Sequence, residues 1–244
     1  MFRRIALALT LMALATSCAN KQLKIPPETL FKEGEQLYAK KKYDNAAEKW
    51  RKAKETTTSP LLRTAVELKL ADALYYDKKY IEAAAEYENF RKLHPKNSKA
   101  PYALYMRGLC NYYQVKKIDI DQTPVKIAAG LFEMFLQEYP DSDMTPQVRE
   151  ILAVCKTRQA DYEMYVGKFY YRTDKYHAAI GRLEEALQKY PVTPHSDEAL
   201  FLLGNAYLRT GNSDKAKESL NRLVTDYPKS KFTDNAKKLL SSNS

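Results

Sequence analysis

The side chains best suited to chemistry are scattered along this chain and form no catalytic cluster. Its three histidines have no helical pairing with one another and no cysteine or carboxylate at metal-site spacing: His94, His177 and His195. His94 directly precedes a proline, so we expect it in a solvated loop. Glu184 and Glu185 are adjacent, but neighbours on a helix point in different directions. No nucleophile elbow or phosphate-binding glycine loop occurs in the sequence. We therefore predict a protein that is not an enzyme and holds no metal or cofactor.

One cysteine does stand where a specific reaction is expected. The chain opens with two arginines, an apolar run from Ile5 to Leu14, and small residues that lead to Cys18. This order is typical of a secretory signal peptide. The apolar run is about half of the ~20 residues that span a bilayer. Residues 1–17 are therefore expected to be removed, so that the mature chain begins near Cys18.

The position of Cys18 resembles the lipobox of bacterial lipoproteins, in which the cysteine is acylated and becomes the first residue. The lipobox prefers leucine three residues before the cysteine, where this chain has Ala15. The same small residues suit the ordinary signal peptidase, so a free, unacylated product stays open. Ala19 follows the cysteine, which by analogy with lipoprotein sorting implies the periplasmic face of the outer membrane. Acyl chains at ~0.8 kcal/mol per buried CH₂ would hold the protein there, and residues 18–27 would form the lipid attachment and tether.

Composition narrows the fold and the partners. The net charge is +10, but the lysines are spread along the whole chain, as on solvated helical faces, and we expect no nucleic-acid partner for an exported protein. Cys110 and Cys155 lie in apolar surroundings, which favours two buried free thiols, although an oxidising compartment permits a disulfide. With 7 glycines, 19 tyrosines and no alternating strand pattern, the chain is predicted to be almost wholly helical.

A repeat organises the chain. Small residues recur in one column, 37 apart within the first three and again between the last two: Gly34, Ala71, Gly108, Gly167 and Gly204. Twelve residues later, alanines form a second column in four of the five units: Ala46, Ala83, Ala179 and Ala216. Large residues follow four positions further on: Trp50, Tyr87, Leu183 and Leu220. This pattern resembles the tetratricopeptide repeat, in which small residues let two antiparallel helices approach closely. We predict an all-α superhelix of about five helix pairs.

The third unit departs from this spacing. Twenty residues separate Gly108 from its matching Ala128, where the other units have twelve. The stretch 145–171 then predicts one long helix. We expect it to join an N-terminal block of three units, residues 28–144, to a C-terminal block of two units, residues 145–244.

A last helix is expected to cover the exposed end of the stack. It would carry Ala236, Leu239 and Leu240 and be capped by Thr233 or Asp234.

A run of tyrosines and apolar residues indicates a binding surface. In this repeat the first helix of each pair lines the concave side, and two positions seven residues apart share one face of that helix. In the last two units, packing within the fold explains the residues at these positions as well as ligand binding does. In the first three units we expect a surface for an extended or hairpin segment rich in aromatics. Its residues are Phe31, Tyr38, Leu68, Tyr75, Tyr76, Tyr105, Tyr112 and Tyr113.

Four stretches together resemble the BamD (ComL) family, lipoproteins of the outer-membrane β-barrel assembly machinery. They are LYMRGL at 104–109, the DQTP insertion with AAGLFEMFLQEYPDSD, the Tyr162-Glu163 pair before VGKFYY, and YHAAIGRLEEALQKYP. The resemblance implies a scaffold that binds the POTRA region of a BamA-type barrel protein, contacts other assembly lipoproteins and receives unfolded outer-membrane proteins by their C-terminal targeting segment. It also implies that Arg182 pairs with an acidic residue of that POTRA domain; the alternative is a solvated arginine beside Glu185. The tyrosine positions would then hold the targeting segment, which tends to end in an aromatic residue.

Two other interpretations stay open. The fifth unit, EALFLLGNAYLRTGNSDKAKESLNRLVTDYPKS, also resembles periplasmic scaffolds of the Tol-Pal-associated CpoB kind. The enlarged third unit and Cys18 favour the BamD family over these scaffolds. An accessory subunit of an envelope enzyme or secretion complex is the third possibility, and no feature of the sequence excludes it.

Overall fold

The computed structural model describes residues 25–115, 117–118, 121–191 and 193–242. The predicted signal peptide, residues 1–17, and the predicted acylation site, Cys18, lie outside these ranges. Within the described ranges the chain forms eleven α-helices and no β-strand, so the all-α prediction is confirmed.

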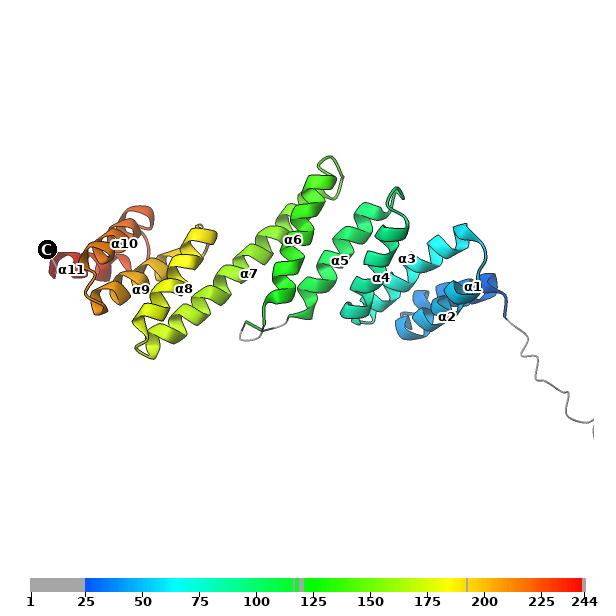
Figure 1. Cartoon of the computed structure of the whole chain (residues 1–244), viewed down its shortest axis with the longest axis horizontal. Helices are drawn as coiled ribbons and strands as arrows, with labels where there is room; N and C mark the ends of the chain where they lie inside the picture. The colour runs from blue at the N-terminus through cyan, green and yellow to red at the C-terminus, as the bar shows by residue number, and fades with distance from the viewer. Residues whose placement is uncertain (1–24, 116, 119–120, 192, 243–244) are drawn as a thin grey trace, which may run out of the picture.

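The helices follow one another along an elongated stack, and each packs against its neighbours in the chain (Figure 1). Their bounds are α1 Pro27–Ala39, α2 Tyr43–Thr56, α3 Pro60–Tyr76, α4 Tyr80–Leu93, α5 Ala100–Gln114, α6 Thr123–Glu138, α7 Thr145–Arg172, α8 Tyr176–Lys189, α9 Ser196–Arg209, α10 Ser213–Asp226 and α11 Thr233–Ser242. The long helix predicted over 145–171 is confirmed as α7, with 28 residues. The number of repeat units stays a prediction.

The glycine column explains how closely the helices of a pair approach. A methyl group added at Gly34 would lie 2.4 Å from Trp50 Nε1, and one added at Gly108 would lie 2.4 Å from Phe132 Cε1. Both distances are far below van der Waals contact, so only glycine fits. Trp50 is fully buried, and its Nε1 donates a hydrogen bond to the Phe31 carbonyl at 3.2 Å. The small and large columns of the sequence therefore meet in space.

Apolar side chains form two clusters that meet within α7. The first runs from Leu30 in α1 to Cys155 in α7, and the second runs from Met164 in α7 to Ala236 in α11. Because α7 contributes to both clusters, it joins the two ends of the stack in one continuous helix. The predicted division between residues 144 and 145 stays a prediction. The N-terminal half of α7, which follows that position, packs with the first apolar cluster.

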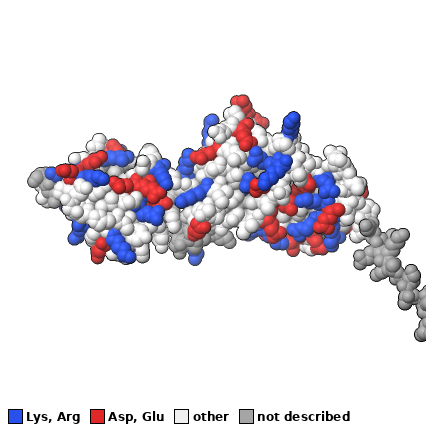
Figure 2. Space-filling model, viewed as in Figure 1, with Lys and Arg blue, Asp and Glu red and all other residues white. Residues whose placement is uncertain are grey.

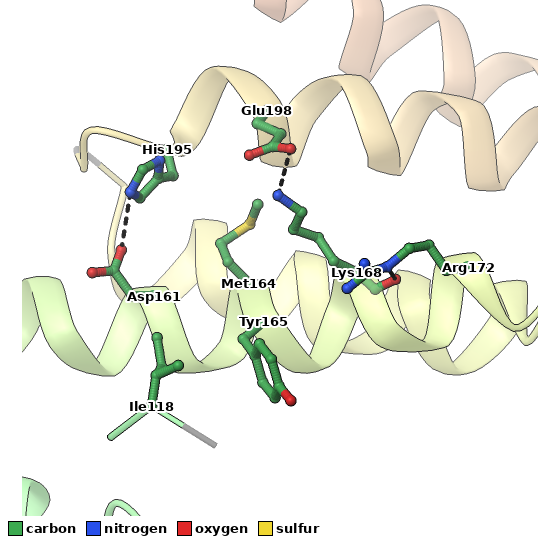
Figure 3. Close-up of a pocket in the computed structure, with 8 residues that line it drawn as sticks. All are labelled: Ile118, Asp161, Met164, Tyr165, Lys168, Arg172, His195 and Glu198. Carbon is green, nitrogen blue, oxygen red and sulfur yellow. Dashed lines mark hydrogen bonds and ion pairs between the residues drawn. The ribbon is translucent and has the colours of Figure 1, made fainter. Parts of the chain in front are cut away.

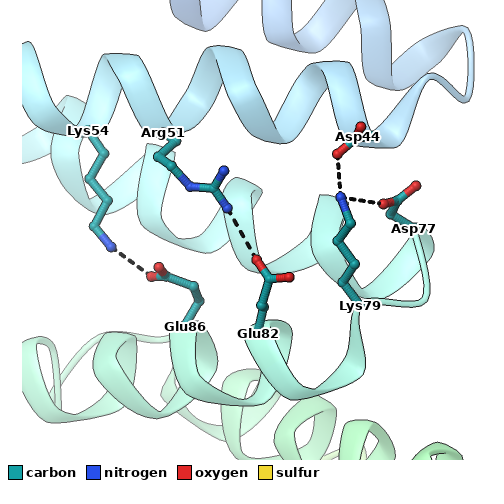
Figure 4. Close-up of polar contacts among 7 residues, drawn as sticks. All are labelled: Asp44, Arg51, Lys54, Asp77, Lys79, Glu82 and Glu86. Carbon is teal, nitrogen blue, oxygen red and sulfur yellow. Dashed lines mark hydrogen bonds and ion pairs between the residues drawn. The ribbon is translucent and has the colours of Figure 1, made fainter.

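Ion pairs fasten α2 to the next helix pair (Figure 4). Lys54 Nζ lies 2.7 Å from Glu86 Oε2, and Arg51 Nη2 lies 3.4 Å from Glu82 Oε2. Lys79, just before α4, contacts Asp44 of α2. Exposed pairs of this kind contribute only ~0.2–1 kcal/mol each. They fix how the pairs are aligned, whereas the buried apolar contacts supply most of the stability.

The last helix covers the end of the stack as predicted, but Thr233 does not cap it in the expected way. Ala236 is fully buried, and Leu239 and Leu240 pack against the second cluster. Thr233 is the first helical residue, and its hydroxyl donates to the Tyr227 carbonyl at 2.8 Å. The hydroxyl therefore forms its hydrogen bond with a backbone carbonyl at the end of α10, and not with the N–H groups at the start of α11.

His94 is not the solvated residue that the sequence predicts. Its Nε2 lies 2.7 Å from Glu67 Oε2, and Glu67 is buried in α3. A buried carboxylate needs such a partner, because removing one from water is costly. The sequence could not reveal this contact, which joins a residue of α3 to the residue that follows the end of α4.

The two other cysteines are free and buried, as predicted. Burial raises the pKa of the Cys110 thiol to about 12 and that of the Cys155 thiol to about 11. Both thiols therefore stay protonated at neutral pH and act as small apolar side chains. None of the helices in the described ranges is long and apolar enough to cross a bilayer.

We predict that Gly108→Ala lowers the free energy of unfolding by about 1–3 kcal/mol, because the new methyl group must displace the buried Phe132 ring. Gly130→Ala is the matched control, since nothing lies within 4 Å of a Cβ at that helical position. It should stabilise the protein by about 0.5–1 kcal/mol through helix propensity alone. Urea unfolding of the two variants measures the difference, and equal effects would contradict the close approach of α5 and α6.

Candidate functional site

Seven tyrosines gather into one surface at an edge of the N-terminal half of the stack. Neighbouring rings lie with centroids 5.2 to 6.3 Å apart, in stacked, tilted and edge-on pairs. We call this set the tyrosine surface: Tyr38, Tyr43, Tyr75, Tyr76, Tyr80, Tyr112 and Tyr113. Edge-on and stacked rings stabilise one another by ~0.5–1.5 kcal/mol per pair. The network therefore holds its members in fixed orientations before any ligand arrives.

The ends of consecutive helices bring these rings together. Tyr38 lies near the end of α1, Tyr76 ends α3, and Tyr113 lies near the end of α5, while Tyr43 and Tyr80 begin α2 and α4. The Tyr43 ring stacks on Tyr76 at 5.3 Å, and the Tyr80 ring stacks on Tyr113 at 5.6 Å. Tyr76 and Tyr113 are 48% and 42% exposed, so they present the open part of the surface.

The structure separates the predicted groove residues into two groups. Five of the eight belong to the tyrosine surface. Phe31 and Leu68 pack against the first apolar cluster. Tyr105 is only 7% exposed, and Gln147 of α7 donates a hydrogen bond to its hydroxyl at 2.7 Å. These three belong to the apolar packing of the fold and not to the tyrosine surface.

Tyr43 and Tyr80 are members of the surface that the sequence analysis did not select. The signal that could have found them is their shared place, three residues before the second alanine column. In the repeat this place packs against the end of the preceding helix, which is where the selected tyrosines lie.

Three phenols of this surface are held neutral by burial. Burial raises the pKa of Tyr38 and Tyr75 well above the ordinary range of tyrosine, and burial also raises the pKa of Tyr80. These three hydroxyls therefore stay protonated at neutral pH, beside the apolar faces of the rings.

A partly buried carboxylate anchors the helix that carries Tyr75 and Tyr76. Asp72 Oδ1 accepts hydrogen bonds from Tyr87 at 2.6 Å and from Tyr102 at 2.9 Å. These bonds tie α3 to α4 and α5. Burial raises the pKa of Asp72 even though both hydrogen bonds favour its charged form.

A second candidate site is Arg182 on α8. Its Nη1 lies 3.1 Å from Glu163 Oε2 of α7, and 3.7 Å from Glu185 Oε2. The Glu163 side chain is 7% exposed and the Arg182 side chain is 43% exposed. Arg182 is therefore more than a solvated arginine beside Glu185, because a buried carboxylate orients its guanidinium. The outer N–H groups stay accessible to another carboxylate.

The other polar residues singled out in the sequence form no reactive cluster. Glu185 accepts a hydrogen bond from Lys189 at 2.6 Å, and that bond lowers the pKa of Glu185. Glu184 accepts from the Tyr207 hydroxyl. Among the residues that the structure describes, no three histidines, cysteines or carboxylates gather as they would around a metal ion.

A stack of helix pairs that displays an aromatic surface and a half-exposed, oriented arginine is a scaffold for binding other proteins. The sequence of this chain matches the model of a protein family over positions 24–221, and that family is described as "Outer membrane lipoprotein" (YfiO). The chain belongs to this family.

Several relatives carry the name "Outer membrane protein assembly factor BamD". The protein of Rickettsia prowazekii is 31% identical over 221 residues, which cover 91% of this chain and 88% of the relative. The protein of Caulobacter vibrioides is 30% identical over 171 residues, which cover 70% of this chain and 56% of the relative. Among solved structures, the "TPR2AB-domain:pHSP90-complex of yeast Sti1" matches with a TM-score of 0.43 and 15% identity, over 83% of this chain and 78% of that one.

We predict that Asp72→Ala lowers the free energy of unfolding by about 1–3 kcal/mol, because the Tyr87 and Tyr102 hydroxyls lose their acceptor. Asp72→Asn keeps an acceptor oxygen and should leave the protein at least as stable as the wild type at neutral pH.

The pH dependence of the same variants checks the charge of Asp72. A raised pKa in the folded state means that this carboxyl stabilises the fold most when it is protonated, and that the contribution declines as pH rises through the folded pKa. The advantage of Asp72→Asn over the wild type should therefore grow from acid to neutral pH in urea unfolding. A constant difference would show that Asp72 does not titrate as described.

Proposed function

We propose that this chain is a lipid-anchored assembly factor for outer-membrane proteins, which acts as a binding scaffold and not as an enzyme. The observation that carries the proposal is its similarity, over 91% of its length, to a protein named as such a factor. The Tol-Pal type of scaffold is not favoured, because the curated relatives carry the assembly-factor name. Acylated Cys18 would place the scaffold on the periplasmic face of the outer membrane.

The tyrosine surface is proposed to receive the C-terminal segments of unfolded outer-membrane proteins. Its exposed rings, Tyr76 and Tyr113, can stack against an aromatic side chain at the end of such a segment. Tyrosine suits this role because it supplies a large contact area with few rotatable bonds. Since the rings are already ordered by one another, little entropy is lost when a segment binds.

Arg182 is proposed to dock on an acidic residue in the POTRA region of a BamA-type barrel protein. Glu163 holds one edge of the guanidinium from inside the protein, so the other edge faces outward in a fixed orientation. Such preorganisation reduces the entropy that binding costs. Other assembly lipoproteins are proposed as further partners.

We predict that Arg182→Gln weakens binding to the barrel protein by about 2–5 kcal/mol, or roughly 30-fold or more, because its acidic partner is left unpaired. The measurement is quantitative capture from detergent-solubilised envelopes with the full chain tagged at its C-terminus. Glu163→Gln keeps the shape but removes the buried charge that orients Arg182, and should weaken capture to a smaller extent.

Arg209→Gln is the matched control, because Arg209 is an exposed arginine on a different helix, α9. It should capture the barrel protein as the wild type does. Capture of Tol-Pal components or peptidoglycan enzymes in place of a barrel protein would contradict the proposed function. Capture of the barrel protein by Arg182→Gln at wild-type level would contradict only the docking residue.

For the tyrosine surface, we predict that Tyr76→Ala and Tyr113→Ala each weaken binding of a peptide with a C-terminal aromatic residue. The loss should be about 0.5–1.5 kcal/mol per ring, or roughly two- to tenfold, as expected for one aromatic pair. Fluorescence anisotropy with a labelled peptide measures it. Ile81→Ala removes an exposed apolar side chain outside the surface and should leave the affinity unchanged. Unchanged affinity in both tyrosine variants would exclude this surface as the peptide site.

A further inference from the structure

Two adjoining hollows run along α7, and the one toward its N-terminal half reaches Arg158, which lies over Tyr112 of the tyrosine surface. One, of about 370 Å³, lies between α7 and the beginning of α9. The other, of about 490 Å³, lies further toward the N-terminal half of α7. Both are lined by Ile118 and Asp161, so they form one continuous depression. We call it the α7 groove.

The wall that α7 supplies to this groove is one face of the helix. Arg158, Asp161, Tyr165, Lys168 and Arg172 follow one another at intervals of three or four residues, which places them in one row. Two exposed aromatic rings lie on this part of the helix, since Tyr165 in the row and Phe169 beside it are 41% and 50% exposed. An exposed aromatic pair on a helix that is otherwise packed on both sides indicates a contact surface.

The middle of the groove holds one ion pair and an aspartate whose buried Oδ1 has no hydrogen-bond partner among the described residues. Lys168 Nζ lies 2.6 Å from Glu198 Oε1, and His195 Nε2 lies 3.5 Å from Asp161 Oδ1 (Figure 3). These contacts tie the beginning of α9 to α7, with Met164 between them in Figure 3. Because Asp161 and Glu198 are acidic, a ligand with carboxylates at its centre would be repelled there.

Each end of the groove carries an arginine that, unlike Lys168, has no carboxylate partner within the described residues. Arg158 lies over the Tyr112 ring, with its guanidinium carbon 5.6 Å from the centroid, and Arg172 Nε donates to the Lys168 carbonyl at 3.4 Å. Within the described ranges of the chain, neither guanidinium forms an ion pair with a carboxylate. Both guanidinium groups can therefore donate hydrogen bonds to a carboxylate of another molecule.

The distance between these arginines sets the length of the ligand. They are fourteen residues apart on a continuous helix, which is about 21 Å at 1.5 Å per residue. An extended peptide covers that distance in about six residues, at ~3.3–3.4 Å each. We infer that the α7 groove binds an extended peptide segment of another protein, with two acidic residues about six positions apart and aromatic or apolar residues between them.

The distribution of charge on the face shown in Figure 2 favours a peptide as the ligand over a ligand with a broad anionic surface, such as nucleic acid or a membrane. Acidic and basic side chains alternate along the face shown in Figure 2, which presents no large area of a single sign. Nucleic acid or an anionic membrane would require such an area. Two separate arginines at the ends of an aromatic groove instead match two separate carboxylates. This site is independent of the proposed docking on a barrel protein.

The test uses a labelled peptide of about nine residues, with two aspartates six positions apart and three aromatic residues between them, titrated onto the full chain in detergent. A peptide of the same composition with the aspartates adjacent is the ligand control. The spaced peptide should bind roughly tenfold more tightly, because only it reaches both arginines. Added salt should weaken its binding more than that of the control peptide.

Variants locate the site. Arg158→Gln and Arg172→Gln should each reduce the affinity of the spaced peptide roughly three- to tenfold. Arg149→Gln should leave it unchanged, because Arg149 is exposed on α7 nine residues before Arg158 and so lies on the opposite face. A combined Arg158→Glu, Arg172→Glu chain should instead prefer a peptide with lysines in place of the aspartates. This reversed preference cannot arise from misfolding.

Three results would overturn the inference. One is equal affinity for the spaced and the adjacent peptide, and another is wild-type affinity in both single arginine variants. The third is a dimer of this chain in sedimentation experiments that both arginine variants abolish, since a second copy would then be the occupant of the groove.

Discussion

The close contact between a small residue on one helix and a large residue on the next is the constraint on which the rest of this structure depends. At Gly34 and Gly108 a single added methyl group would overlap the ring of Trp50 or Phe132. At Gly167 it would lie 2.9 Å from Leu183 Cδ2 and 3.7 Å from Arg182 Cβ. The same close approach of α8 to α7 brings Arg182 within reach of buried Glu163.

The same packing also assembles the tyrosine surface. Each helix pair places the end of its first helix beside the start of its second, and stacking repeats this edge along the molecule. Tyrosines at those ends therefore become neighbours in space, although Tyr43 and Tyr76 are far apart in the sequence. Helix α7 contributes to both apolar clusters, so the tyrosine surface and Arg182 belong to one continuous scaffold.

The sequence predicted what depends on periodicity and missed what depends on contacts between helices. The residue columns predicted the helical fold, the long helix α7 and the final helix, because each column reflects one face of a helix. Tyr105 has the same place in its unit as Phe31, yet Gln147 of α7 donates a hydrogen bond to its hydroxyl. The partners of His94 and Arg182, which are Glu67 and Glu163, also come from other helices. No spacing rule within one helix could indicate such pairs.

The most direct test of the central claim is photo-crosslinking in living cells, with a photoreactive phenylalanine analogue in place of Tyr76. The same analogue in place of Ile81, which is exposed outside the tyrosine surface, is the control. The account predicts that the probe at Tyr76 labels outer-membrane proteins in their unfolded form, while the probe at Ile81 does not. Equal labelling at both positions, or labelling at Tyr76 of soluble periplasmic proteins alone, would contradict it.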